Sequence, residues 1–354
     1  MSRLKYFRIF KNTSFLSYQH INYSRIHYSS TTCKESKPNL KTLLDNSTSF
    51  SERNPPADEW HTPVYPQKHR LQSEKSIRLK VDPRSTSVIL FPGQGCQYVG
   101  MAKKLLSYPN VKDMFDCASE ILRYDLLDLC LNGPEDMLNM TVHSQVAVMV
   151  SSLAAVEKLR ADAEKMIENC AATAGLSVGE YAALVFAGAL DFENAVRLLK
   201  IRGEAMQAAS DLEPGGMMTV FTEPGAKIKM ACQAAREWCL EQTTYNAECS
   251  VAMYLCPGGK VVSGHIEALK FLESNAAKFR IKGNQTPTMD QMKKKLAEQL
   301  CNPIEWEQIM HIMFERPQGE KFPNVYECGP GTSMKSMLKL NNNTAYKNCE
   351  NVLA

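Results

Sequence analysis

The stretch that most constrains the fold is Gly175–Gly179, which reads GLSVG and follows the pattern G-x-S-x-G. The pattern places a serine, here Ser177, on a tight turn between a strand and a helix, where its hydroxyl enters a cleft. The short run CAATAG precedes it, and a helix-like run with Glu180 in its first turn follows it. Ser177 is therefore a candidate nucleophile, and such a serine needs a base, usually a histidine, to take its proton. The alternative is a small-residue turn at the start of a helix.

Strands alternate with helices around this motif. Val88–Phe91 is a continuous apolar run that ends in Pro-Gly, which is typical of a buried strand, and the run before Ser177 is a second candidate strand. Residues 112–130 and 144–166 lie between them and have helical periodicity. This alternation predicts an α/β domain with a mainly parallel sheet.

A second, smaller unit is predicted inside that domain. Residues 215–282 follow the order strand, helix, strand, strand, helix, strand, which is the ferredoxin-like arrangement. We therefore expect a large α/β domain over residues 86–214 and 283–354, with a ferredoxin-like small domain over residues 215–282 inserted in it. A polar segment interrupted by prolines, residues 35–85, is predicted to be a linker.

The first 34 residues differ in kind from the rest. They contain six Arg or Lys residues and six serines, and no Asp or Glu precedes Glu35. An acid-free start rich in Arg and Ser is typical of an organelle transit peptide. We therefore expect residues 1–34 to direct the protein to the mitochondrial matrix; the alternative is a disordered basic tail.

The remaining composition argues against several classes of function. The twelve cysteines are scattered and form no C-x-x-C pair, so we expect free thiols and no metal site. No run approaches the roughly eighteen apolar residues of a membrane span. Clustered Arg and Lys residues interleaved with aromatics, which indicate a nucleic-acid surface, are absent from the sequence.

A second motif, FPGQGCQYVGM, follows the first predicted strand. Its turn Gly93-Gln94-Gly95 would let the main chain approach a ligand closely, because glycine carries no Cβ; the alternative is a simple β-turn. Since both motifs follow strands, we expect them to converge at one edge of the sheet. The N–H of Val178, at the start of the next helix, would then point at an oxyanion formed above Ser177.

Arg202 lies on the clearest helix of the sequence, residues 190–209, for which Asp191 is a plausible N-cap. The other side chains predicted on its face are apolar: Ala195, Leu198, Leu199 and Met206. A guanidinium group among such side chains either extends to solvent or meets an anion. These residues alone leave both interpretations open.

Six motifs, in order over roughly residues 86–340, resemble those of malonyl-CoA:acyl carrier protein transacylases. They are FPGQGCQYVGM, GLSVGEYAALVFAGAL, DFENAVRLLKIRGEAMQ, GGKVVSGHIEAL, EQLCNPIEW and ECGPG. With its basic N-terminal segment, the chain is most similar to the mitochondrial members, which serve type II fatty acid synthesis. The resemblance implies an α/β-hydrolase-like large domain. It also implies malonyl transfer from malonyl-CoA to the phosphopantetheine thiol of acyl carrier protein, by a monomer without a cofactor.

The same resemblance implies roles for individual residues. Ser177 would carry the malonyl group, and the N–H groups of Gln94 and Val178 would form the oxyanion hole. Arg202 would bind the free carboxylate of malonate as a bidentate pair. Gln299, in the run AEQLCNP, corresponds to the family's active-site glutamine, which holds the catalytic histidine.

That histidine is missing from the sequence. In the family it follows the small domain in a segment like PVSGAFHS, whereas here KFRIK runs directly into GNQTPTMDQ. A few tens of residues are absent between about Lys282 and Gly283. Four of the seven histidines precede the large domain, and His143, His265 and His311 match family positions that are not catalytic.

Three functions follow from this pattern. The leading one is transfer of a malonyl group from malonyl-CoA to acyl carrier protein through an acyl-serine intermediate, although we expect slow transfer by this chain because the base is missing. The second is a non-catalytic protein that only binds acyl carrier protein. The third is an esterase of the α/β-hydrolase type that uses His311 as its base.

Overall fold

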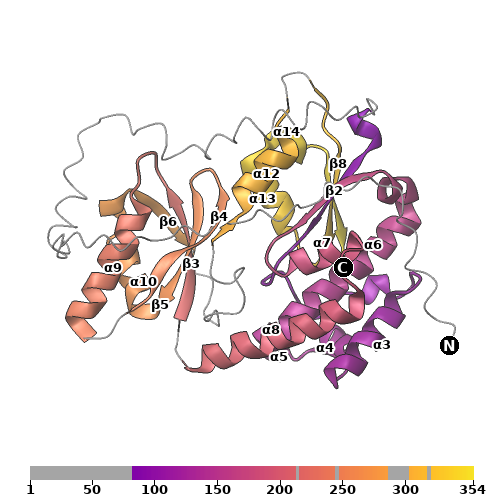
Figure 1. Cartoon of the computed structure of the whole chain (residues 1–354), viewed down its shortest axis with the longest axis horizontal. Helices are drawn as coiled ribbons and strands as arrows, with labels where there is room; N and C mark the ends of the chain where they lie inside the picture. Colours follow the sequence, from indigo (N-terminus) through magenta and orange to yellow (C-terminus); the bar gives the residue numbers. More distant parts are fainter. Residues whose placement is uncertain (1–81, 213–214, 244–246, 286–302, 317–319) are drawn as a thin grey trace, which may run out of the picture.

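A computed structural model describes residues 82–212, 215–243, 247–285, 303–316 and 320–354. The expected transit peptide, most of the expected linker and Gln299 lie outside these ranges. Two sheets lie side by side, each with its own helices (Figure 1).

The first sheet contains the strand that precedes each of the main motifs. Its strands are β1 (Ser87–Phe91), β2 (Cys170–Gly175), β8 (Asn324–Gly329) and β9 (Cys349–Leu353). They lie in the order β2-β1-β8-β9, and every neighbouring pair is parallel. All residues of β1 are buried. The predicted mainly parallel α/β sheet is thus confirmed, and the motif-bearing ends of its strands meet at one edge.

Alternate residues of β1 point into two separate cores, as the period of two in a strand requires. Ile89 and Phe91 pack with the first helical layer, and Val88 and Leu90 pack with the second. The first layer comprises α3 (Val111–Leu122), α4 (Leu126–Asn132), α5 (Glu135–Asn139), α6 (Thr141–Glu168), α7 (Gly179–Phe186) and α8 (Phe192–Leu212). The second comprises α12 (Trp306–Phe314), α13 (Ser333–Asn341) and α14 (Asn343–Tyr346). Short 3₁₀ helices lie at Pro83–Ser85, Lys103–Leu105 and Ala276–Phe279.

The second sheet has the predicted ferredoxin-like order. Its elements are β3 (Gly215–Thr222), α9 (Ile228–Thr243), β4 (Cys249–Cys256), β5 (Gly259–His265), α10 (Ile266–Ser274) and β6 (Ile281–Gln285). The strand order is β6-β3-β5-β4-β7, and β3, β4, β5 and β6 pair antiparallel. The short strand β7 (Ile304–Glu305) adds to β4 in parallel, although we expected its residues in the large domain.

The helices α12 and α13 join the two sheets. In one core with Val88 of β1, α12 contributes Trp306 and Met310, and α13 contributes Met334 and Leu338. Met253 of β4 borders the same core. The side chain of Asn341 donates a 2.9 Å hydrogen bond to the carbonyl of Leu255 at the end of β4. Figure 1 shows these helices between the two sheets.

Candidate active site

Ser177 lies on a strained turn between β2 and α7, as the G-x-S-x-G pattern predicts. Its φ is 53°, in the left-handed region that a residue with a side chain seldom occupies. The glycines of the motif make the turn possible, because a Cβ on Gly175 would lie 1.9 Å from the carbonyl carbon of Gly179. A Cβ on Gly179 would lie 2.3 Å from the carbonyl oxygen of Phe91. The turn therefore packs directly on the end of β1.

The Gln94 loop lies against the residue that precedes the serine. A Cβ on Gly93 would lie 2.7 Å from the carbonyl oxygen of Leu176, so only glycine fits there. The side chain of Gln94 donates a 2.8 Å hydrogen bond to the hydroxyl of Thr141 at the start of α6. No hydrogen bond within the described ranges uses the backbone N–H of Gln94 or of Val178. Val178 itself is fully buried, whereas Gln94 is half-buried.

The loop that follows β8 reaches the same edge of the sheet. A Cβ on Gly331 would lie 3.2 Å from the Cβ of Cys96, just beyond the Gln94 turn. Glu327, in the last part of β8, is fully buried, and its carboxylate accepts 2.9 Å hydrogen bonds from the N–H groups of Met334 and Lys335. Burial nevertheless raises the pKa of Glu327 above its usual value, and these hydrogen bonds oppose the shift. Glu327 thus holds the first turn of α13 in place.

Arg202 extends from α8 to the nucleophile. One terminal nitrogen, Nη2, donates a 3.3 Å hydrogen bond to Oγ of Ser177, and the other, Nη1, donates to Oε1 of Gln145. Its Nε is buried without a partner in the described part of the chain. Only 7% of Arg202 is exposed, so it does not extend to solvent. Burial lowers the pKa of Arg202, while Tyr181 and Glu180 act in the opposite direction.

One residue predicted on the buried face of α8 is exposed instead. Ala195, Leu199 and Met206 are buried with Arg202, but Leu198 is 46% exposed. The period of 3.6 residues places position 198 at the border of the buried stripe, where the neighbouring helix does not cover it. Asp191 precedes α8 as expected, and its carbonyl accepts the N–H of Ala195.

Gln145 is a site residue that the sequence reasoning missed. It is fully buried on α6, contacts Arg202, and donates a 3.2 Å hydrogen bond to the sulfur of Met206. Thr141 and Gln145, a polar pair one turn apart just before the apolar run over residues 146–150, were the signal available in the sequence.

None of the three described histidines serves Ser177. His143 packs edge-on against the ring of Tyr124, with 4.8 Å between the ring centroids. Nδ1 of His265 accepts a 2.8 Å hydrogen bond from the N–H of Glu248, in the small sheet. His311 lies 3.8 Å from Glu307 on its own helix, and its side chain is 45% exposed. The structure thus offers no support for an esterase that uses His311 as its base.

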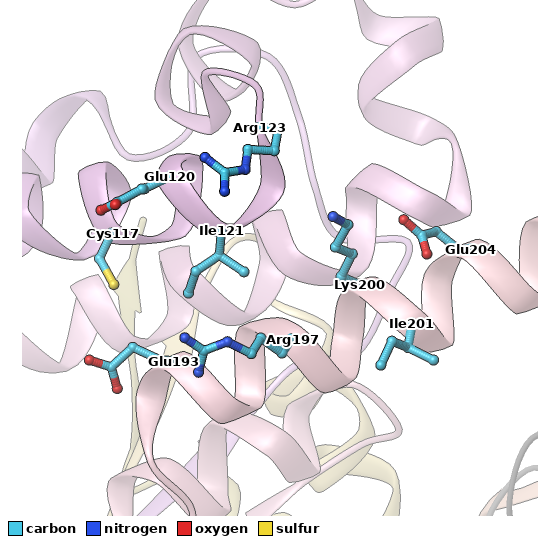
Figure 2. A pocket seen from close by; sticks show the side chains of 9 residues that line it. All are labelled: Cys117, Glu120, Ile121, Arg123, Glu193, Arg197, Lys200, Ile201 and Glu204. Atoms are coloured by element: carbon cyan, nitrogen blue, oxygen red, sulfur yellow. The ribbon is translucent and has the colours of Figure 1, made fainter.

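A separate groove runs between α3 and α8 (Figure 2). Its lining residues are Cys117, Glu120, Ile121, Arg123, Glu193, Arg197, Lys200, Ile201 and Glu204. Acidic and basic side chains line it together, and none of the predicted site residues is among them. This groove is therefore distinct from the site around Ser177.

Within the described ranges, no group of three or more His, Cys, Asp or Glu side chains is arranged to hold a metal ion. Every helix in those ranges is too short or too polar to span a bilayer.

The known proteins that this chain resembles belong to one family. The acyl transferase domain model matches residues 88–268. A probable mitochondrial malonyl-CoA-acyl carrier protein transacylase of Drosophila melanogaster is 41% identical, over 79% of this chain and 86% of that protein. The mitochondrial malonyl-CoA-acyl carrier protein transacylase of Homo sapiens is 42% identical, over 75% and 79%.

Solved structures agree with this result. The malonyl CoA-acyl carrier protein transacylase of Coxiella burnetii matches with a TM-score of 0.64 and 26% identity, over 77% of this chain and 95% of that chain. A malonyl-transacylase in complex with its type II PKS acyl-carrier protein matches with a TM-score of 0.62 and 25% identity, over 75% and 94%.

The alignment lengths also show an internal gap. The Drosophila alignment spans 325 residues but covers 79% of the 354 residues here, which is about 280. Roughly 45 positions of the relative, the difference between 325 and 280, therefore have no counterpart in this chain. A missing segment between about Lys282 and Gly283 stays a prediction.

Proposed function

The chain belongs to the acyl transferase family of malonyl-CoA:acyl carrier protein transacylases, and on that premise we propose that it carries malonyl groups from malonyl-CoA to acyl carrier protein through Ser177. Ser177 is the nucleophile of this reaction, and mitochondrial fatty acid synthesis is its setting.

One observation carries the proposal, namely the contact between Arg202 and Ser177. A buried guanidinium 3.3 Å from a nucleophilic hydroxyl suits an acyl group that bears a second carboxylate. An acetyl group offers no such anion, and an unpaired buried cation is costly. The site therefore favours malonyl over acetyl groups.

The transfer takes place in two steps at one atom. Oγ of Ser177 attacks the thioester carbonyl and gives its proton to water. The bond from carbon to the sulfur of coenzyme A then breaks, and the leaving thiolate takes up a proton from water. The phosphopantetheine thiol of acyl carrier protein then attacks the seryl ester and releases the serine. In both steps the carbonyl oxygen becomes negative, and in this proposal the N–H groups of Gln94 and Val178 bind it.

Proton transfer from Ser177 is the slow step of the proposed reaction. Ser177 has no histidine partner among the described residues, and Arg202 can only donate to it. The family's histidine segment is missing, and Gln299, which we propose held that histidine, would have lost its partner. We therefore propose slow acylation, with binding of the carrier protein retained as the second candidate function.

We also propose that the protein acts as a monomer. The acid-free N-terminal segment supports import into the mitochondrial matrix.

The test is single-turnover labelling of the purified 354-residue chain with radiolabelled malonyl-CoA. The comparison is a repaired chain, in which the aligned histidine segment of the Drosophila relative is inserted after Lys282. We expect label on Ser177 in both, with the repaired chain faster by about 10⁴- to 10⁶-fold. A Ser177→Ala variant of the repaired chain should take up no label. Labelling of this variant, or equal rates in the two chains, would contradict the proposal.

A further inference from the structure

We infer that the hydroxyl group of Thr141 positions the Gln94 loop, so that the main chain of Gln94 meets the oxyanion that forms above Ser177. Thr141 is thus a positioning residue, because it acts through Gln94 and not on the substrate. The inference rests on the proposed function, in which the N–H of Gln94 is one half of the oxyanion hole. Its basis is the set of hydrogen bonds that tie the loop to the junction of α5 and α6.

The loop needs such ties because glycines flank Gln94 on both sides. Glycine leaves the main-chain angles wide open, and Gly95 has a φ of 102°. Gly93 is held by its close contact with the carbonyl oxygen of Leu176. A Cβ on Gly95, in contrast, would meet no atom of the described ranges within 4 Å, so packing does not hold that side of the loop. Hydrogen bonds must therefore fix the direction of the Gln94 main chain.

The main tie joins the loop to a buried hydroxyl group. Nε2 of Gln94 donates to Oγ1 of Thr141 at 2.8 Å, and Thr141 is fully buried. Thr141 is also the first residue of α6, whose buried side chains pack in one core with Phe91 of β1. The Ser177 turn packs on the carbonyl of the same Phe91. The anchor of the loop and the nucleophile therefore share one rigid frame, as a preorganised oxyanion hole requires.

A second tie lies at the surface. Nε2 of Gln97 donates to Oδ1 of Asn139 at 2.8 Å, and Oε1 of Gln97 accepts from the N–H of Gly95 at 2.8 Å. Asn139 is exposed, so water can replace its contact with Gln97. Thr141 is therefore the anchor on which the position of the loop depends most.

Substitutions can separate the hydroxyl group of Thr141 from its shape. Thr141→Val keeps the branched side chain but removes the acceptor, whereas Thr141→Ser keeps the acceptor. Gln94→Met removes the donor of the same hydrogen bond and leaves the backbone N–H in place. Thr86→Val is the matched control, because it removes a 2.7 Å hydrogen bond to the carbonyl of Pro83. Thr86 precedes β1, at the end of the strand opposite to the site.

The experiment measures single-turnover labelling of Ser177 over a range of concentrations of radiolabelled malonyl-CoA, in the 354-residue chain and in the repaired chain. We expect Thr141→Val and Gln94→Met each to lower the maximal labelling rate about tenfold or more. The half-saturating concentration should not change, since the oxyanion forms only when the thioester carbonyl is attacked. Thr141→Ser and Thr86→Val should stay within about threefold of the parent rate.

A double variant tests whether the two residues act as one unit. Because Thr141 and Gln94 form a single contact, Thr141→Val combined with Gln94→Met should slow labelling no more than either change alone. Losses that multiply would contradict the inference.

The outcomes separate the two proposals. If neither parent chain labels Ser177, the proposed function fails. If Ser177 is labelled, the positioning role is wrong when Thr141→Val keeps the parent rate, when its loss lies in the half-saturating concentration, or when Thr141→Ser loses as much. Circular dichroism checks folding, and if Thr141→Val does not fold, the rate and half-saturating concentration of Gln94→Met decide the question in the same way.

Discussion

At the scale of single residues, the site depends on a strained backbone. Ser177 holds a left-handed conformation, which costs an L-residue about 1–2 kcal/mol. Gly175 and Gly179 make room for this turn, because any Cβ at either position would meet backbone atoms within 2.3 Å. Packing elsewhere must therefore offset the strain.

We expect Gly175→Ala to destabilise the fold by about 3 kcal/mol, since the atoms it would meet are main chain and cannot move aside. Urea denaturation measures the change. Gly188→Ala is the control: its Cβ has open space, so only the left-handed backbone of Gly188 should matter, at about 1–2 kcal/mol. Equal losses at the two positions would contradict the close-packing argument.

We expect Arg202→Ala, made in the repaired chain, to cost malonyl transfer about 2–5 kcal/mol and to spare acetyl transfer. The reason is that only the malonyl group offers a carboxylate to the guanidinium. Rates with malonyl-CoA and acetyl-CoA, measured side by side, check this. Similar losses for both acyl groups would exclude the clamp.

At the scale of elements, the junction of β8 and α13 holds a buried charge. The carboxylate of Glu327 accepts hydrogen bonds from two N–H groups at the start of α13 and from the side chain of Asn351. Burial outweighs these bonds and raises the pKa of Glu327. The folded chain therefore binds this proton more tightly than the unfolded chain does.

This shift predicts the sign of a pH effect. Because the folded state binds more protons above the ordinary pKa of 4.5, the free energy of unfolding should fall as pH rises from that value through the raised one. Urea titrations between about pH 4.5 and 7 should show a steeper fall in the wild-type chain than in Glu327→Gln. Parallel curves, or a steeper fall in the variant, would contradict the assignment.

Local sequence patterns predicted most of the helices and strands, and tertiary packing explains where the structure differs from the prediction. Val88–Phe91 and the Ser177 turn were visible because a buried strand and a strained turn each demand particular residues. Residues 112–130, expected as helix throughout, divide into α3 and α4 because Arg123 takes a left-handed conformation. Strand β7 could not be foreseen from two residues, since pairing with β4 creates it.

The candidate site was predicted in part for the same reason. Ser177 and the Gln94 loop belong to sequence motifs, and Arg202 was marked by its apolar neighbours. Gln145 belongs to no motif, and its role exists only because α6 and α8 bring it against Arg202. The burial of Arg202 likewise depends on packing between elements, which periodicity alone does not settle.

At the scale of the whole molecule, the missing segment bears on stability as well as chemistry. A return segment from the small sheet would be lost with the histidine, which leaves strand edges without cover. We expect the repaired chain to unfold at a temperature about 5 °C or more above that of the present chain. Calorimetric scans of both, with Ser177→Ala in each to remove acylation, make the comparison. An equal or lower midpoint for the repaired chain would argue against a structural role for the segment.

The destination of the molecule in the cell is predicted to depend on its N-terminal segment. Residues 1–34, fused to a fluorescent reporter, should carry it into mitochondria, because basic, acid-free segments are recognised for import. Imaging checks the location, with a fusion in which the six basic residues become Gln as the control. A diffuse cytosolic signal from the unaltered fusion would contradict the expectation.

The glycines around Ser177 also have a genetic consequence. Every missense change in a glycine codon adds at least a β-carbon, whichever base is altered. At Gly93, Gly175 and Gly179 that single atom would meet main chain at 2.7 Å or closer. A survey of inherited variants should therefore find these three codons as intolerant as the codon for Ser177, although none of the three supplies a reacting atom.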